Sequence, residues 1–173
     1  MKKFLTMLTL TISMGCSSMN FKATNKKLDL EKFMGTWYVQ SGRVTMLENG
    51  AHNPIEKYTY NDQKERIDID FHYNKNSLTG PIKEIGQKGW VVNQPINTHW
   101  KISPLWPLKF DYLVLDFDPN YEWTAIGVPS GRYLWLMTRQ KEYNKDQIEL
   151  IKKNLEKIGY PLNDIEIFPH SED

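Results

Sequence analysis

Cysteine is almost absent from this chain: Cys16 is the only one among 173 residues. An intrachain disulfide needs two cysteines, so packing and hydrogen bonds must stabilise the fold without one. An excess of one charge sign is also missing, because 21 acidic residues nearly balance 22 lysines and arginines. Without a basic field the chain lacks the electrostatic footprint of a nucleic-acid binder. We therefore expect no nucleic-acid partner.

Apolar runs long enough to cross a bilayer as a helix are missing too. The run from Phe4 to Met14 contains several threonines and is too short for a span. It follows the basic pair Lys2 and Lys3, and a positive start before a short apolar stretch is typical of an export signal. We predict that residues 1–15 are a signal peptide.

The residues Gly15-Cys16-Ser17-Ser18 come next and resemble the lipobox of bacterial lipoproteins. The resemblance implies that Cys16 becomes the N-terminus and carries three acyl chains, which would anchor it stably in a membrane. Ser17 resembles the residue found in lipoproteins sorted to an outer membrane, so in a cell with two membranes the domain would face the periplasm. A plain secretory signal with an incidental cysteine is the alternative.

Polar residues continue to residue 27 and predict a flexible stalk over 16–27. No repeat or second compositional regime follows, so we expect one barrel domain over 28–173.

Short strand patterns separated by turn residues fill most of this domain. Alternation is clearest where Ile67, Ile69, Phe71 and Tyr73 interleave with polar residues. The expected strands are 37–42, 55–60, 67–73, 78–87, 98–103, 110–117, 122–128 and 132–139. Short links between consecutive strands favour an antiparallel meander. The fold class is therefore all-β, an eight-stranded up-and-down barrel that either is filled by side chains or holds one small ligand.

One helix is expected over 144–158, after the strands. Asn144 can cap it, and Gly159 ends it. Its apolar stripe is one-sided, so the helix must pack on the outside of the barrel. The segment 110–117 is apolar on both faces, which predicts that one of its faces lies beneath this helix. The tail 165–168 is a candidate for a last short strand.

Three motifs at matching distances carry a family resemblance. Gly35-Thr36-Trp37, the acidic-aromatic segment 116–121 and Thr138-Arg139 resemble the three signatures of the lipocalins, most closely the bacterial outer-membrane lipoproteins and the apolipoprotein D branch. The resemblance implies that Gly35, Trp37 and Arg139 are structural and that the Arg139 guanidinium stacks on the Trp37 indole at the closed end. It also implies a fatty acid or lysophospholipid as ligand. Homodimers occur in the bacterial branch, so a second copy of the chain is a candidate partner.

Ligand contacts are expected on the inward phase of the strands, where Trp and Tyr are frequent and favour an amphipathic ligand. The candidates are Val39, Tyr58, Ile69, Phe71, Trp100, Tyr112, Val114, Trp123, Tyr133 and Trp135. The apolar loop 103–108 is either part of the barrel mouth, a contact surface for a membrane or second subunit, or a packed connector.

Catalytic and metal-binding patterns are scarce. The four histidines, His52, His72, His99 and His170, are not in metal-ligand spacing with one another. We predict a binding protein, neither an enzyme nor a carrier of a metal or cofactor, that stores or transports lipid for membrane maintenance. The alternatives are an enzyme built on the barrel (an isomerase, or a haem- or peroxide-handling protein) and a structural envelope lipoprotein with a filled barrel.

Overall fold

The computed structural model describes residues 20–171. The predicted signal peptide, Cys16 and the first residues of the predicted stalk lie outside this range. The elements in chain order are α1 (Leu30–Phe33), β1 (Gly35–Arg43), β2 (Ala51–Asn61), a 3-10 turn (Asp62–Lys64), β3 (Arg66–Lys75), β4 (Ile82–Val91), β5 (His99–Ser103), β6 (Phe110–Phe117), β7 (Trp123–Gly127), β8 (Leu134–Thr138), α2 (Lys145–Lys157) and β9 (Glu166–Ile167).

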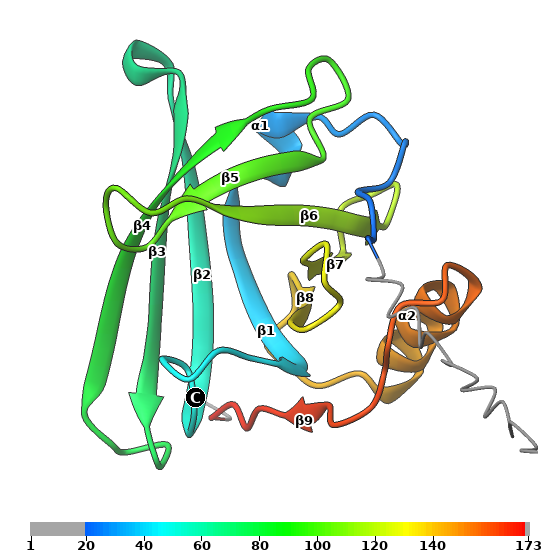
Figure 1. The fold of residues 1–173 in the computed structure, drawn as a ribbon. Helices are drawn as coiled ribbons and strands as arrows, with labels where there is room; N and C mark the ends of the chain where they lie inside the picture. Colours follow the sequence, from blue (N-terminus) through cyan, green and yellow to red (C-terminus); the bar gives the residue numbers. More distant parts are fainter. Residues whose placement is uncertain (1–19, 172–173) are drawn as a thin grey trace, which may run out of the picture.

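Strands β1 to β8 form a closed antiparallel barrel (Figure 1). Each strand pairs with the next one in the chain, and β1 closes the barrel by pairing with both β8 and β2. Closure removes the free edges that an open sheet would expose. Strand β9 adds to β1 through Ser41 and Gly42. The predicted all-β up-and-down barrel with one outer helix is confirmed, as is the short last strand.

Strand boundaries differ from prediction at β4. This strand begins at Ile82 because residues 77–80 form a turn in which the Gly80 amide donates to the Ser77 carbonyl at 3.0 Å. Pro81 has no amide hydrogen to offer to the ladder. Strand β2 starts earlier than predicted, at Ala51, with a bulge between His52 and Ile55. Strand β4 thus lies further toward the C-terminus than the expected strand at 78–87, because of the turn that precedes it.

Helix α2 covers the outer face of β6, β7 and β8 (Figure 1). Its Asn144 cap accepts a hydrogen bond from the Gln147 amide at 3.0 Å, as the sequence predicts. Ile148, Ile151 and Leu155 are fully buried against the sheet, and each such burial contributes roughly 1.5–3 kcal/mol. Ile158, the last residue of the predicted helix, is instead 49% exposed because it is the C-cap, where the chain leaves the helix.

The end of the barrel near α1 is closed by side chains. Trp37 donates from its indole N–H to the Phe33 carbonyl at 2.9 Å, and Arg139 lies over its ring, 3.7 Å from guanidinium carbon to ring centre. Gly35 has a φ of +95°, and a Cβ there would meet Arg139 Nη1 at 3.4 Å. Glycine is thus suited to this position both by backbone conformation and by the nearby guanidinium.

Residues 20–27 lie along the outside of the barrel. The Phe21 amide donates to the Pro129 carbonyl in the β7–β8 loop at 2.8 Å, and the Phe21 ring packs 4.6 Å from that of Tyr160. Further on, the Thr24 amide donates to the Val114 carbonyl at 2.9 Å, and Lys26 pairs with Asp116 at 2.6 Å. This part of the chain differs from the predicted free stalk because its backbone is hydrogen-bonded to β6 and to the loop before β8. None of the helices within residues 20–171 is long and apolar enough to cross a membrane.

Candidate functional site

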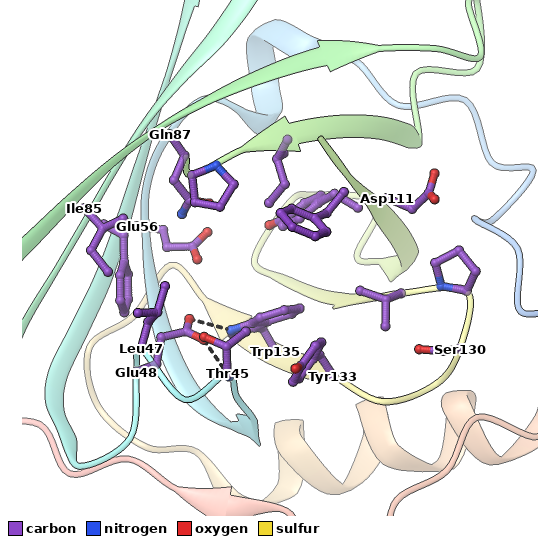
Figure 2. Close-up of a pocket in the computed structure, with 17 residues that line it drawn as sticks. Thr45, Leu47, Glu48, Glu56, Ile85, Gln87, Asp111, Ser130, Tyr133 and Trp135 are labelled. Carbon is purple, nitrogen blue, oxygen red and sulfur yellow. Dashed lines mark hydrogen bonds between the residues drawn. The ribbon is translucent and has the colours of Figure 1, made fainter. Parts of the chain in front are cut away.

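The barrel interior has two parts along its axis. Near α1 it is filled by packed rings, with Phe33 and Trp100 meeting edge to face at 5.3 Å between centroids. Toward the other end it contains a cavity of about 510 Å³, within the range typical of small-molecule sites. Loops β1–β2, β5–β6 and β7–β8 surround this end, which we call the mouth. The lining residues are Thr45, Leu47, Glu48, Glu56, Phe71, Ile85, Gln87, Ile102, Pro104, Phe110, Asp111, Tyr112, Val128, Pro129, Ser130, Tyr133 and Trp135 (Figure 2).

Glu56 is the most buried acidic group of the site. It lies on the same face of β2 as Tyr58, which packs in the filled half, and its carboxylate points into the cavity (Figure 2). Tyr58 donates to Glu56 Oε2, and the Tyr58 and Tyr112 hydroxyls are 2.5 Å apart. Either of these two hydroxyls can donate to the other.

The environment of Glu56 favours its neutral form. Burial and the nearby charge of Glu48 raise the Glu56 pKa to about 8, against the lowering effect of Tyr112. Burial and the two glutamates also raise the pKa of Tyr112 well above its usual value. At neutral pH, Glu56 is therefore mostly protonated.

Glu48 extends from the β1–β2 loop into the mouth. Its Oε2 accepts from the amide of Thr45 at 2.8 Å and from the Thr45 hydroxyl at 2.7 Å, while Oε1 accepts from the Trp135 indole N–H at 3.0 Å (Figure 2). Burial raises the Glu48 pKa, although all three donors act to lower it. The loop and β8 are thus joined through one buried carboxylate.

Among the described residues, those that line the cavity include no lysine, arginine or histidine. Asp111, the third acidic lining residue, is paired at 2.6 Å with His99 and at 2.7 Å with Lys101. Its carboxylate is turned away from Glu56 (Figure 2). Glu48 and Glu56 form no ion pair within residues 20–171. The uncompensated acidic groups of the cavity are therefore these two glutamates.

Aromatic rings form much of the remaining wall. Tyr112 stacks on Trp135 at 6.3 Å between centroids and on Trp100 at 5.4 Å, and Tyr133 packs 6.0 Å from Trp135. Phe71 contributes a further ring to the lining from β3. Such rings offer apolar area and, on their faces, a negative potential.

The mouth carries an apolar rim, which we define as Met46, Leu47, Leu105, Trp106, Leu108 and Phe110. Each of these side chains is more than half exposed, up to 92% for Met46 and 68% for Trp106. Lys109 lies over the Trp90 ring at 4.0 Å. Of the three sequence-based interpretations of loop 103–108, the packed connector is wrong, because its apolar side chains face solvent beside the cavity.

The predicted contact residues separate into three groups. Phe71, Tyr112, Tyr133 and Trp135 line the cavity. The remaining inward residues belong to the barrel interior but not to the cavity lining; they are Val39, Tyr58, Ile69, Trp100 and Val114. The prediction that Trp123 faces the barrel interior is wrong, because it lies on the outer face of β7, packed in the cluster beneath α2.

Sequence reasoning missed both glutamates. Glu56 is two residues before Tyr58 in the same strand, so the period of two could have placed both side chains on the inner face. Glu48 sits in a loop, where no period applies. Within residues 20–171 no group of three or more histidine, cysteine or acidic residues is arranged to hold a metal ion.

Comparison with known sequences gives a consistent family. A family model described as a lipocalin-like domain matches residues 28–170. Temperature-induced lipocalin-1 of Arabidopsis thaliana is 34% identical over 155 residues, which cover 85% of this chain and 82% of that protein. The outer membrane lipoprotein Blc of Vibrio cholerae is 22% identical over 136 residues, 78% of each chain.

Solved structures with low sequence identity share the fold. The cockroach allergen Per a 4 superposes with a TM-score of 0.63 at 18% identity, covering 89% of this chain and 96% of its own. Insecticyanin of the tobacco hornworm Manduca sexta superposes with a TM-score of 0.64 at 11% identity, covering 90% of both chains.

Proposed function

The chain belongs to the lipocalin family, and on that premise we propose that it binds one fatty acid or lysophospholipid in the barrel cavity and stores or transports it at the cell envelope. Its relatives are lipocalins, which in general bind small hydrophobic molecules, and an envelope lipoprotein is among them. The observation that carries the proposal is the cavity of about 510 Å³ with an aromatic wall and an apolar rim.

The energetics of chain burial support a lipid ligand. Burying about twelve methylenes at ~0.8 kcal/mol each gives a gross gain of about 10 kcal/mol. Loss of about 2–4 kcal/mol to ordering and to lost translational freedom leaves roughly 6–8 kcal/mol, which corresponds to a dissociation constant of about 1–40 μM. Packed rings such as Trp100 occupy half of the barrel, so we expect the remaining half to hold a single alkyl chain.

The path of the N-terminal segment supports a mouth that faces a membrane. Phe21 is hydrogen-bonded to Pro129, a residue that lines the mouth. Cys16 precedes Phe21 by five residues, and an extended residue spans at most ~3.6 Å, so an acylated Cys16 would hold the mouth within about 18 Å of the bilayer. In a cell with two membranes we place the protein on the outer membrane, facing the periplasm.

We expect carriage and not catalysis. Neither histidine nor cysteine is among the described residues that line the cavity. Glu56 accepts from the Tyr58 hydroxyl, but its neutral form, which predominates at neutral pH, is not a base that would activate this hydroxyl as a nucleophile.

Uptake of a fluorescent fatty acid by the mature domain, purified without detergent, tests the proposal. We expect saturable binding of one probe per chain, displaced by dodecanoate and by a lysophospholipid of equal chain length. A probe that gains no fluorescence at micromolar protein, or that no lipid displaces, would contradict it.

A further inference from the structure

We infer that the cavity selects amphiphiles whose buried end is an ammonium group, held beside Glu56 and Glu48 against an aromatic wall, and that it discriminates against a buried carboxylate. This inference rests on the proposed function, since it concerns the same cavity. It specifies which chemical end group the barrel accepts at depth, and it requires that a bound fatty acid keep its carboxylate outside the cavity, toward solvent.

The charge distribution is the first support. Glu56 is only 4% exposed and Glu48 only 8%, and both reach the cavity without a cationic partner among the described residues. A ligand carboxylate placed beside them would add a third acidic group where burial already disfavours two. An ammonium group would instead provide the missing counter-charge.

The aromatic wall is an independent support. Tyr112 stacks on Trp135, Tyr133 packs against Trp135 at a tilt, and Phe71 also lines the cavity. Clusters of ring faces attract quaternary ammonium groups through their negative potential, and Trp provides the strongest attraction. An anionic or hydroxyl end group gains nothing comparable from these faces.

The hydrogen bonds of the two glutamates suit the same ligand. Glu48 is fixed by three donors and needs no further one. Glu56 is hydrogen-bonded only to the tyrosine hydroxyls of Tyr58 and Tyr112, which carry no charge, so a cation beside it would favour loss of its proton. Binding of a permanent cation is therefore coupled to proton release from Glu56, whose surroundings also include Tyr112, Glu48 and, more distantly, Asp111.

Competition with a neutral fluorescent probe gives a direct test. The ligands are dodecyltrimethylammonium, dodecanoate and 1-dodecanol, each below its micelle concentration. We expect the ammonium ligand to bind at least about tenfold more tightly than dodecanol at pH 8, and dodecanoate to bind no more tightly than dodecanol.

The pH profile separates the carboxylate from simple hydrophobic burial. The ammonium ligand cannot titrate, so its affinity should rise by up to about tenfold per pH unit between pH 6 and 7.5 and level off above pH 8. Dodecanol should show no such rise. E56Q should abolish the rise and lower the ratio of ammonium affinity to dodecanol affinity about tenfold. E84Q makes the same change on an exposed part of β4 and should behave as wild type.

The outcomes distinguish the inference from the function on which it depends. Equal affinities for all three ligands, or a flat pH profile for the ammonium, would overturn the inference while leaving lipid binding intact. If none of the three displaces the probe, both fail. If E56Q does not fold, the wild-type pH profile and E48Q decide, and E48Q is expected to weaken ammonium binding selectively.

Discussion

Arg139 and Trp37, 102 positions apart in the chain, form one unit at the closed end of the barrel. The guanidinium carbon lies 3.7 Å from the indole centroid. Arg139 also donates to the carbonyls of Thr36 at 2.6 Å and Met34 at 2.8 Å. It therefore provides hydrogen-bond donors for the backbone carbonyls between α1 and β1. This contact joins β1 to the end of β8 at the closed end of the barrel, away from the ligand cavity.

Replacing Arg139 with lysine should therefore destabilise the fold. Lysine keeps the charge but loses the planar stack and the forked hydrogen bonds. We expect a loss of about 2–4 kcal/mol in the free energy of unfolding, measured by urea denaturation. R132K is the control, because Arg132 is exposed and lies over Tyr133 at 5.4 Å. An R139K protein as stable as R132K would mean that the stack contributes nothing.

Stability should depend on pH through Glu56. Its folded pKa, about 8, is above the model-peptide value of 4.5. Between these values the folded state binds more protons than the unfolded state, so stability falls as pH rises from about 4.5 to 8. By pH 8 the loss in unfolding free energy, relative to low pH, reaches roughly 4 kcal/mol.

The E56Q variant isolates this effect. Glutamine cannot ionise, so the difference in unfolding free energy between E56Q and wild type should grow in favour of E56Q as pH rises toward 8. Denaturation at pH 5, 6.5 and 8 measures it. A difference that is constant across these pH values would show that Glu56 is not buried in its neutral form.

The strand pattern predicts the barrel well, and physical features explain where it fails. Strand β7 is buried on both faces, so alternation cannot decide on which side Trp123 lies. The side toward α2 follows only from the three-dimensional packing. Glu56 violates the rule that inward positions are apolar, and such violations concentrate at functional sites.

The loop residues could not be predicted at all. Glu48 enters the cavity because the chain at 44–50 folds back and is fastened to Trp135, a contact across 87 positions. No local pattern announces such a contact. The contacts of residues 20–27 with β6 are equally non-local, and their polar composition suggested a free stalk instead.

Trp135 and Trp123 provide a matched pair for locating the ligand. Trp135 lines the cavity, whereas Trp123 is buried beneath α2. A brominated fatty acid quenches only rings that it approaches closely. We expect W135F to lose most of the quenching and W123F to retain it. Equal quenching in both variants would place the lipid outside the barrel mouth.

The apolar rim should mediate contact with lipid surfaces. The double variant L105S/W106S removes two side chains that are 69% and 68% exposed. We expect the non-acylated mature domain to bind phosphatidylglycerol-containing vesicles several-fold more weakly after this change, with unfolding free energy within about 0.5 kcal/mol of wild type. Unaltered vesicle binding, measured by co-sedimentation, would exclude the rim as the contact.

Cys16 is predicted to carry the anchor. The variant C16A should leave the precursor unprocessed or release the protein from the membrane, because no acyl chain can then be attached. Membrane fractionation and the mass of the mature protein check this. Tight membrane association of a processed C16A protein would show that the attachment does not depend on Cys16.

Native mass spectrometry of the mature domain, gently purified from its own envelope, tests the central claim most directly. We expect a population that carries one amphiphile per chain, released on denaturation and identified by its fragment masses. A uniformly empty barrel that also fails to take up added dodecanoate, dodecyltrimethylammonium or lysophospholipid would contradict the account.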